Sequence, residues 1–237
     1  MPILRSAQPL SRAAAPLRHW LLAIVALMGL ALPAAAQQPS PAAEPVILAL
    51  GDSLTAGYQL PSQDGFTAQL ERALRARGRA VRVHNAGVSG DTSSGGRQRL
   101  QWVLNGLKQK PALAIVELGA NDMLRGIDPS VTRANLDAIL AEFRKRGIPV
   151  VLAGMFSSPT LGVDYVDRFN RLYPDLAKKH GATLYPFFLK GVAFNPPLLL
   201  PDGLHPNARG VDVIVRNMLP TIEGALTKAN APAVRRG

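Results

Sequence analysis

The chain has 237 residues, of which 47% are hydrophobic and 18% charged, a composition that suits one globular domain with a substantial core. It contains no Cys, which excludes disulfides, thiolate nucleophiles and Cys-ligated metals. The formal net charge of +11 is compatible with a nucleic acid or an anionic membrane surface as partner. However, the basic residues are spread along the expected helices and aromatic residues make up only 5% of the chain. We therefore expect a solvated basic surface and no nucleic-acid partner.

The first 36 residues have the pattern of a secretory signal peptide. Three Arg residues precede an apolar run over residues 20–32, and small residues follow it up to Ala36. This run is shorter than the ~20 residues that span a bilayer. We predict cleavage after Ala36, export to the periplasm or the medium, and no stable membrane anchor; an uncleaved signal anchor is the alternative. Cleavage removes three Arg and no acids, which lowers the net charge from +11 to +8.

The rest of the chain divides into a flexible leader over residues 37–44, a single domain over residues 45–229 and a frayed tail over residues 230–237. Short apolar or alternating runs predict five strands, at residues 45–50, 80–85, 113–118, 149–153 and 183–185. Apolar residues at helical spacing predict helices between them, at residues 66–74, 94–108, 129–147, 165–180 and 207–229. We expect the last helix to be broken near Pro220.

Strands and helices alternate without a hairpin signal, which predicts a parallel sheet with helices on both faces. Right-handed crossovers bring the carboxyl ends of all these strands to one edge. Gly51, Gly87, Gly119 and Gly154 each end a strand, so the loops after them share a single rim. Open α/β folds bind their ligands at this rim, and functional residues are expected there.

Ser53 follows the first strand at this rim, where a hydroxyl can serve as a nucleophile or as a helix cap. His205 lies in a loop three residues after Asp202, so the carboxylate can orient the imidazole as a general base. A Ser–His–Asp site is recognised by these roles and not by chain order. A surface Asx turn with a bystander His is the alternative for this pair.

An acyl-transfer site also needs hydrogen-bond donors for the oxyanion. The backbone of Ser53, the loop residue Gly90 and the amide of Asn121 are candidates on the same rim, although Gly90 also suits an ordinary turn and Asn121 a helix cap. Rival motifs are absent from the sequence: it has no Gly-x-Ser-x-Gly, no phosphate loop and no Gly-x-Gly-x-x-Gly after a strand. With no Cys and few His, we expect neither a metal nor a cofactor.

Four segments now carry a resemblance to a known family: residues 51–58 (GDSLTAGY), 85–93 (NAGVSGDTS), 117–122 (ELGAND) and 202–206 (DGLHP). In this order and spacing they resemble the SGNH (GDSL-type) hydrolase superfamily, especially its periplasmic group of acyl-CoA thioesterase I, lysophospholipase and arylesterase. The resemblance implies a flavodoxin-like three-layer α/β/α sandwich with about five parallel strands. It also implies a triad of Ser53, Asp202 and His205, with oxyanion donors at Ser53, Gly90 and Asn121. Ala120 stands where close relatives often have Gly, so substrate preference does not transfer.

The resemblance also implies a mobile substrate loop formed by Met123, Leu124, Arg125, Gly126 and Ile127. The apolar residues 155–156 and 196–200 either shape an acyl groove or pack in the core. We predict a monomeric serine hydrolase that cleaves small-molecule carboxylic esters or thioesters through an acyl-enzyme on Ser53. The alternatives are a carbohydrate or peptidoglycan O-acetylesterase with the same triad, a non-catalytic exported binding module and, with least support, a nucleic-acid-binding domain.

Overall fold

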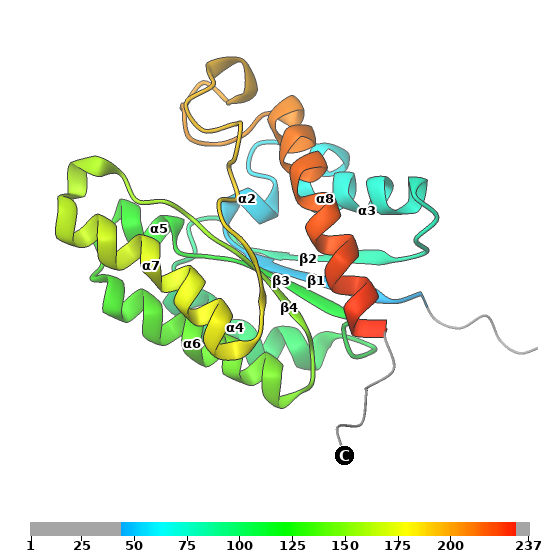
Figure 1. The fold of residues 1–237 in the computed structure, drawn as a ribbon. Coiled ribbons are helices and arrows are strands. Elements are labelled where there is room, and N and C mark those ends of the chain that lie inside the picture. Colours follow the sequence, from blue (N-terminus) through cyan, green and yellow to red (C-terminus); the bar gives the residue numbers. More distant parts are fainter. Residues whose placement is uncertain (1–43, 231–237) are drawn as a thin grey trace, which may run out of the picture. The chain divides into compact units, whose positions relative to one another are not determined.

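The computed structural model describes residues 44–230, so the expected signal peptide, most of the leader and most of the tail lie outside the described residues. Five strands form one sheet: β1 (Val46–Gly51), β2 (Arg82–Gly87), β3 (Leu113–Glu117), β4 (Val150–Ala153) and β5 (Thr183–Tyr185). Every neighbouring pair is parallel and the strand order is β2-β1-β3-β4-β5, with β1 and β3 in the centre (Figure 1). This is the flavodoxin-like order, and it confirms the predicted fold class.

Helices cover both faces of the sheet. The long ones are α3 (Phe66–Ala76), α4 (Ser93–Gly106), α6 (Pro129–Lys145), α7 (Val163–His180) and α8 (Ala208–Asn230). α3 packs against α8 on one face, while α6 packs against α4 and α7 on the other (Figure 1). The core lies between these layers, where α6 buries Leu136, Ile139, Leu140 and Phe143 at the helical spacing seen in the sequence. Because helices cover both faces, β3 is buried along its whole length, as parallel strands usually are.

The structure corrects two of the predicted boundaries. β2 begins at Arg82, two residues later than predicted, because its partner β1 begins at Val46 and the two strands pair in that register. The predicted break near Pro220 is wrong, since α8 continues through this residue. Pro220 removes one backbone hydrogen bond, but apolar residues on both sides of it, Met218, Leu219 and Ile222, are buried against the domain. Helix stability in proteins comes largely from such packing, which explains the continuity.

Shorter elements near the rim were not predicted. They are α2 (Ser53–Ala56), α5 (Ala120–Leu124) and the 3₁₀ turns η1 (Ser62–Asp64), η2 (Pro159–Leu161) and η3 (Pro196–Leu198). α2 and α5 start directly after the two central strands, β1 and β3. Gly119, between β3 and α5, has a φ of 118°, and a Cβ there would lie 2.2 Å from Tyr173 Oη. Only glycine fits this sharp turn, which brings α5 back over the sheet edge.

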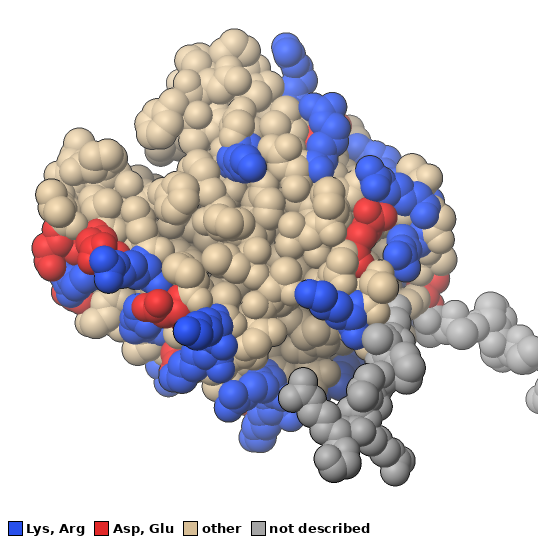
Figure 2. Space-filling model, viewed as in Figure 1, with Lys and Arg blue, Asp and Glu red and all other residues tan. Residues whose placement is uncertain are grey.

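Charges on the surface are interspersed. Figure 2 shows acidic side chains among the Lys and Arg side chains over the flank formed by α6 and α7. Ion pairs there include Arg133 with Asp175, Arg168 with Asp128 and Asp164, and Arg171 with Asp167. Such alternation of sign is typical of a solvated helix face. No helix within residues 44–230 combines the length and apolarity needed to cross a bilayer.

Candidate active site

Ser53 is the first residue of α2, at the carboxyl end of the central strand β1. The helix is capped by Asp52, whose Oδ1 accepts the N–H of Leu54 at 3.0 Å. The role of helix cap, one of two open for Ser53 from the sequence, therefore belongs to its neighbour. The Ser53 hydroxyl points elsewhere, and its Oγ lies 2.9 Å from Nε2 of His205.

His205 and Asp202 come from the loop between η3 and α8. His205 Nδ1 lies 2.7 Å from Asp202 Oδ2, so the proton sits on Nδ1 when the other nitrogen accepts the serine hydroxyl. Asp202 Oδ1 also accepts the backbone N–H groups of Leu204 at 2.9 Å and His205 at 3.0 Å. The N–H of His205 is the main cause that lowers the pKa of Asp202 to about 2. The Asx turn that was the alternative for this pair is thus present, and the same turn aims the carboxylate at the imidazole.

Tyr58 is a further residue of this site that the sequence did not single out. Its ring packs on the His205 imidazole with the ring centroids 4.4 Å apart and the planes tilted by 35°. Asp202 contacts the edge of the imidazole and Tyr58 contacts its face, so together they restrict the orientation of the ring. The one signal available in the sequence was an aromatic residue five positions after Ser53 in the first motif.

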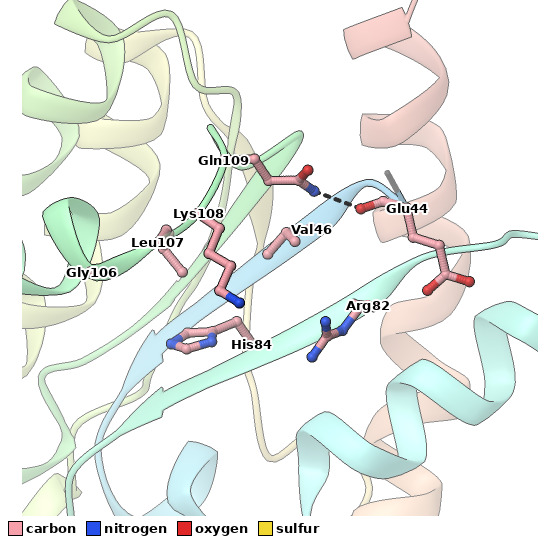
Figure 3. A pocket seen from close by; sticks show the side chains of 8 residues that line it. All are labelled: Glu44, Val46, Arg82, His84, Gly106, Leu107, Lys108 and Gln109. Atoms are coloured by element: carbon pink, nitrogen blue, oxygen red, sulfur yellow. Dashed lines mark hydrogen bonds between the residues drawn. The ribbon is translucent and has the colours of Figure 1, made fainter. Parts of the chain in front are cut away.

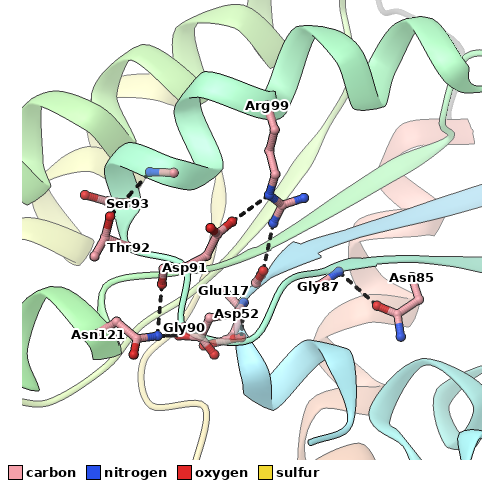
Figure 4. Close-up of polar contacts among 12 residues, drawn as sticks. Asp52, Asn85, Gly87, Gly90, Asp91, Thr92, Ser93, Arg99, Glu117 and Asn121 are labelled. Atoms are coloured by element: carbon pink, nitrogen blue, oxygen red, sulfur yellow. Dashed lines mark hydrogen bonds and ion pairs between the residues drawn. The ribbon is translucent and has the colours of Figure 1, made fainter.

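The two predicted oxyanion donors outside α2 are Gly90, in the loop after β2, and Asn121, in the helix α5 that follows β3. Gly90 is exposed and has a φ of 84°, a conformation that favours glycine. Asn121 lies within α5, whose cap position is Gly119, so it is not a helix cap. Its Nδ2 donates to the carbonyl of Asp91 at 2.9 Å and to Asp52 Oδ2 at 3.2 Å (Figure 4). In this arrangement both amide hydrogens are already hydrogen-bonded in the free protein.

The predicted substrate loop begins inside α5, because Met123 and Leu124 are the last two residues of that helix. Met123 is half-buried against the core, whereas Leu124 and Gly126 are exposed. Arg125 reaches across the rim, and its Nη2 donates to the carbonyl of Gly90 at 2.7 Å. The carbonyl of Ile127 accepts the hydroxyl of Tyr165 from α7 at 2.8 Å. Hydrogen bonds therefore join the substrate loop to the loop that carries Gly90 and to the helix α7.

Asp122, next to Asn121, supports the site from below. It is buried and accepts the N–H of Ser93 at 2.7 Å, the Ser93 hydroxyl, and the Thr132 hydroxyl at 3.0 Å. These contacts tie α5 to α4 and α6. Asp122 therefore acts as a structural support for the segment that carries Asn121.

Two buried acids lie behind Ser53, and sequence reasoning missed them. Asp52 is 1% exposed and Glu117, the last residue of β3, is also 1% exposed. Burial raises the pKa of Asp52 to about 6. Burial, followed by the charge of Asp52, raises the pKa of the Glu117 carboxyl well above its usual range. The signal was an acid within an otherwise apolar, buried strand, which is rare without a partner.

One surface depression borders the predicted site, and a larger cavity lies away from it. A shallow depression borders Ser53, His205 and Tyr58. A separate cavity of about 580 Å³ opens at the other end of the sheet, near the start of β1, where Arg82, His84 and Lys108 line it (Figure 3). None of the predicted site residues lines that cavity.

Of the apolar candidates, Met155 is buried in the core, while Phe156 is half exposed and stacks on Phe187 with the ring centroids 4.8 Å apart. Residues 44–230 hold no cluster of three His, Asp or Glu side chains arranged for a metal ion.

A parallel α/β sheet that carries a hydrogen-bonded Ser, His and Asp at the carboxyl edge of its central strands is the arrangement of a serine hydrolase. A family model described as the GDSL-like Lipase/Acylhydrolase family matches residues 49–213 of the chain. The chain therefore belongs to this family of acylhydrolases, and the predicted resemblance is confirmed. The exported binding module without catalytic activity and the nucleic-acid-binding domain lose their support.

Known relatives agree with this assignment. The chain is 41% identical over 160 residues to an arylesterase of Vibrio mimicus, which covers 68% of this chain and 79% of that protein. It is 36% identical over 166 residues to thioesterase 1/protease 1/lysophospholipase L1 of Escherichia coli (strain K12), which covers 70% of this chain and 77% of that protein. Among solved structures, the SGNH-hydrolase family esterase AlinE4 is 48% identical with a TM-score of 0.67, covering 81% of this chain and 100% of that one.

Proposed function

We propose that the protein hydrolyses carboxylic esters and thioesters through an acyl-enzyme on Ser53, with His205 as general base and Asp202 as its orienting carboxylate. The observation that carries this proposal is the continuous hydrogen-bonded chain from Ser53 Oγ through His205 to Asp202, with contacts of 2.9 and 2.7 Å. Its position at the edge where β1 and β3 end supports the same role, because ligands of this fold bind there.

The reaction has two steps. The Ser53 Oγ–H proton passes to His205 Nε2 while Oγ bonds to the substrate carbonyl carbon, and the proton then goes to the leaving oxygen or sulfur as its bond to carbon breaks. Water attacks the acyl-enzyme in the second step, giving a proton to His205, which returns it to Ser53 Oγ as the carboxylic acid leaves. Asp202 stabilises the imidazolium in both steps. Its lowered pKa of about 2 keeps it ionised at neutral pH.

The oxyanion of each tetrahedral intermediate is held by the N–H groups of Ser53 and Gly90 and by the Asn121 amide. Within residues 44–230, neither of the two N–H groups donates a hydrogen bond to the protein. For Asn121, the bond to Asp52 is the longer of its two at 3.2 Å, so this hydrogen is the one that turns toward the oxyanion. Loss of one such donor typically costs ~10²–10³ in turnover.

The substrate is a small-molecule acyl ester or thioester, as in the relatives named arylesterase and thioesterase/lysophospholipase. The segment from Met123 to Ile127 borders its binding site, because Arg125 bonds to the proposed oxyanion loop at Gly90. We also propose that the protein works as a monomer after export to the periplasm or the medium, with the signal peptide removed after Ala36. N-terminal sequencing of the exported protein tests this cleavage.

The proposed mechanism is tested by hydrolysis of p-nitrophenyl esters of graded acyl length with wild type, Ser53→Ala and Ser89→Ala. Ser89 is an exposed serine on the neighbouring rim loop and serves as the matched control. We expect Ser53→Ala to lose at least about 10³-fold in kcat, by analogy with other triad enzymes, and Ser89→Ala to stay near wild type. A fluorophosphonate probe should label wild type and Ser89→Ala but not Ser53→Ala. Equal activity of wild type and Ser53→Ala contradicts the mechanism, and activity confined to acetyl esters identifies an O-acetylesterase.

A further inference from the structure

The buried acids Asp52 and Glu117 touch the proposed oxyanion site through a single amide. Asp52 Oδ2 accepts the Asn121 Nδ2–H at 3.2 Å, and its Oδ1 caps α2 directly beside Ser53. The backbone N–H of Asp52 donates to Glu117 Oε2 at 3.4 Å, so the two acids are direct neighbours. Figure 4 shows the three residues grouped where the ends of β1 and β3 meet α5. The catalytic steps described above assign no part to Glu117.

The hydrogen-bond partners of Glu117 indicate where its proton lies. Oε2 accepts two donors, the Thr55 hydroxyl at 2.8 Å and the backbone N–H of Asp52 at 3.4 Å. Oε1 is buried and accepts no hydrogen bond from the described residues. An ionised carboxylate would leave Oε1 both charged and unsolvated, which is costly in a protein interior. A protonated Oε1 can instead act as a donor, and the carboxylate of the neighbouring Asp52 is a candidate acceptor.

We propose that Glu117 is a positioning residue for hydrolysis: as a neutral acid it donates to the Asp52 carboxylate, which in turn holds the Asn121 amide with its nitrogen toward the oxyanion. This inference rests on the function proposed above for Asn121. Asp52 accepts hydrogen bonds from Asn121 and from the Leu54 N–H, which it does best as an ionised carboxylate. The Glu117 proton stabilises the negative charge of that carboxylate. In the free protein this bond keeps Nδ2 at the oxyanion site, and its length of 3.2 Å lets the hydrogen turn to the oxyanion when substrate binds.

The surroundings of the pair favour one shared proton. Tyr173 from α7, which donates to the carbonyl of Leu118, and Asp122 from α5 add no positive charge beside Glu117. Arg99 from α4 is neutralised by Asp91 at 2.6 Å and donates to the carbonyl of Gly51. Within residues 44–230, the one charged group that lowers the pKa of Asp52 by its charge is His205 of the active site. Burial therefore keeps Glu117 protonated while Asp52 faces the active site.

A double-mutant cycle on kcat tests the proposal. Glu117→Met removes the donor at similar volume, Glu117→Gln keeps a donor for Asp52 and an acceptor for Thr55, and Asn121→Ala removes the amide. We expect Glu117→Met to lower kcat about tenfold to a hundredfold, a part of the ~10²–10³ that an oxyanion donor contributes. We expect Glu117→Gln to stay within about threefold of wild type, and Glu117→Met to have no further effect in the Asn121→Ala background. If Glu117→Met does not fold, Asp52→Asn replaces it in the cycle. This variant keeps the side-chain volume and the oxygen that caps α2. Its amide nitrogen, however, presents a donor to Asn121 or to Glu117, both of which need an acceptor there.

The outcomes separate the two proposals. A loss in kcat with unchanged KM, rescued by Gln and absent in the Asn121→Ala background, supports the positioning role. An equal loss of kcat from Glu117→Met in both backgrounds overturns it, as does a Glu117→Gln variant as slow as Glu117→Met. If Asn121→Ala itself leaves kcat unchanged, the oxyanion role of Asn121 in the proposed function is wrong. Thermal unfolding of each variant shows whether a change in kcat exceeds what a loss of folded protein explains.

Discussion

Two aspartates support the site around Ser53, and their surroundings shift their pKa values in opposite directions. Asp202 is about one-third exposed in its side chain and accepts two backbone N–H groups, the first of them from His205, which lower its pKa to about 2. Asp52 is 1% exposed, and burial raises its pKa to about 6. The comparison teaches that the environment assigns each carboxyl its role. The exposed one supplies a fixed negative charge to an imidazole, and the buried one shares a proton with a second acid.

The largest expected effect is on the exposed aspartate. Asp202→Asn should lower kcat about 10⁴-fold, the size of the equivalent change in serine proteases, because an amide favours the wrong imidazole tautomer. Its control is Asp128→Asn, which changes another exposed aspartate that lies in an ion pair with Arg168. Measurement of kcat on a short p-nitrophenyl ester distinguishes them. A drop of less than tenfold in Asp202→Asn would show that the imidazole does not depend on this carboxylate.

The buried pair should appear in the pH dependence of stability. A raised pKa in the folded state means that the native protein holds a proton which the unfolded chain releases above about pH 4.5, the ordinary value for Glu. The free energy of unfolding then falls as pH rises, by up to about 1.4 kcal/mol per pH unit for one proton, until the folded-state pKa of the pair is passed.

Glu117→Gln cannot release that proton, so its stability should fall less than that of wild type between pH 5 and 8. Urea unfolding of both proteins at each pH gives the difference directly. Glu71→Gln, which changes a glutamate on α3 away from this pair, is the control. Parallel curves for wild type and Glu117→Gln would mean that Glu117 titrates as in the unfolded chain.

The smallest effect concerns the cap of α2. Asp52→Asn retains an oxygen that can accept the Leu54 N–H, whereas Asp52→Ala does not. We expect Asp52→Ala to be less stable than Asp52→Asn by about 1 kcal/mol, the usual contribution of a helix cap. Chemical denaturation at pH 7 measures the difference. Equal stability of the two variants would show that the oxygen at position 52 contributes little as a cap.

Much of the fold, and the grouping of Ser53, His205 and Asp202 into one candidate site, could be predicted from the sequence for identifiable reasons. Four strands are short apolar or alternating runs that a glycine ends or follows. Because parallel strands share one carboxyl edge, Ser53, Gly90 and Asn121 were expected on the same rim. The close spacing of Asp202 and His205 limited the geometry of that pair to a single tight turn. These features depend on local pattern and on topology, and both can be read from one chain.

The remaining parts depend on contacts between segments distant in the chain. Glu117 was counted as one residue of an apolar strand, because nothing in the sequence shows that β1 places Asp52 beside it. The two acceptors of the Asn121 amide, Asp52 and the carbonyl of Asp91, come from the segments after β1 and β2. A sequence motif does not show which amide hydrogen bonds to which acceptor. Similarly, α8 passes through Pro220 because tertiary packing outweighs the local cost of proline.

The contact between Ser53 and His205 joins residues 152 positions apart, and within residues 44–230 the loop that carries His205 is followed by α8 alone. Closure of such a long span comes late in folding, because its entropic cost is recovered only when the sheet is already assembled. A chain still emerging from a ribosome or a translocation pore has its serine but lacks its base. The enzyme therefore has no hydrolytic activity until the segment with His205 and α8 has docked, and its first turnover marks the completion of folding.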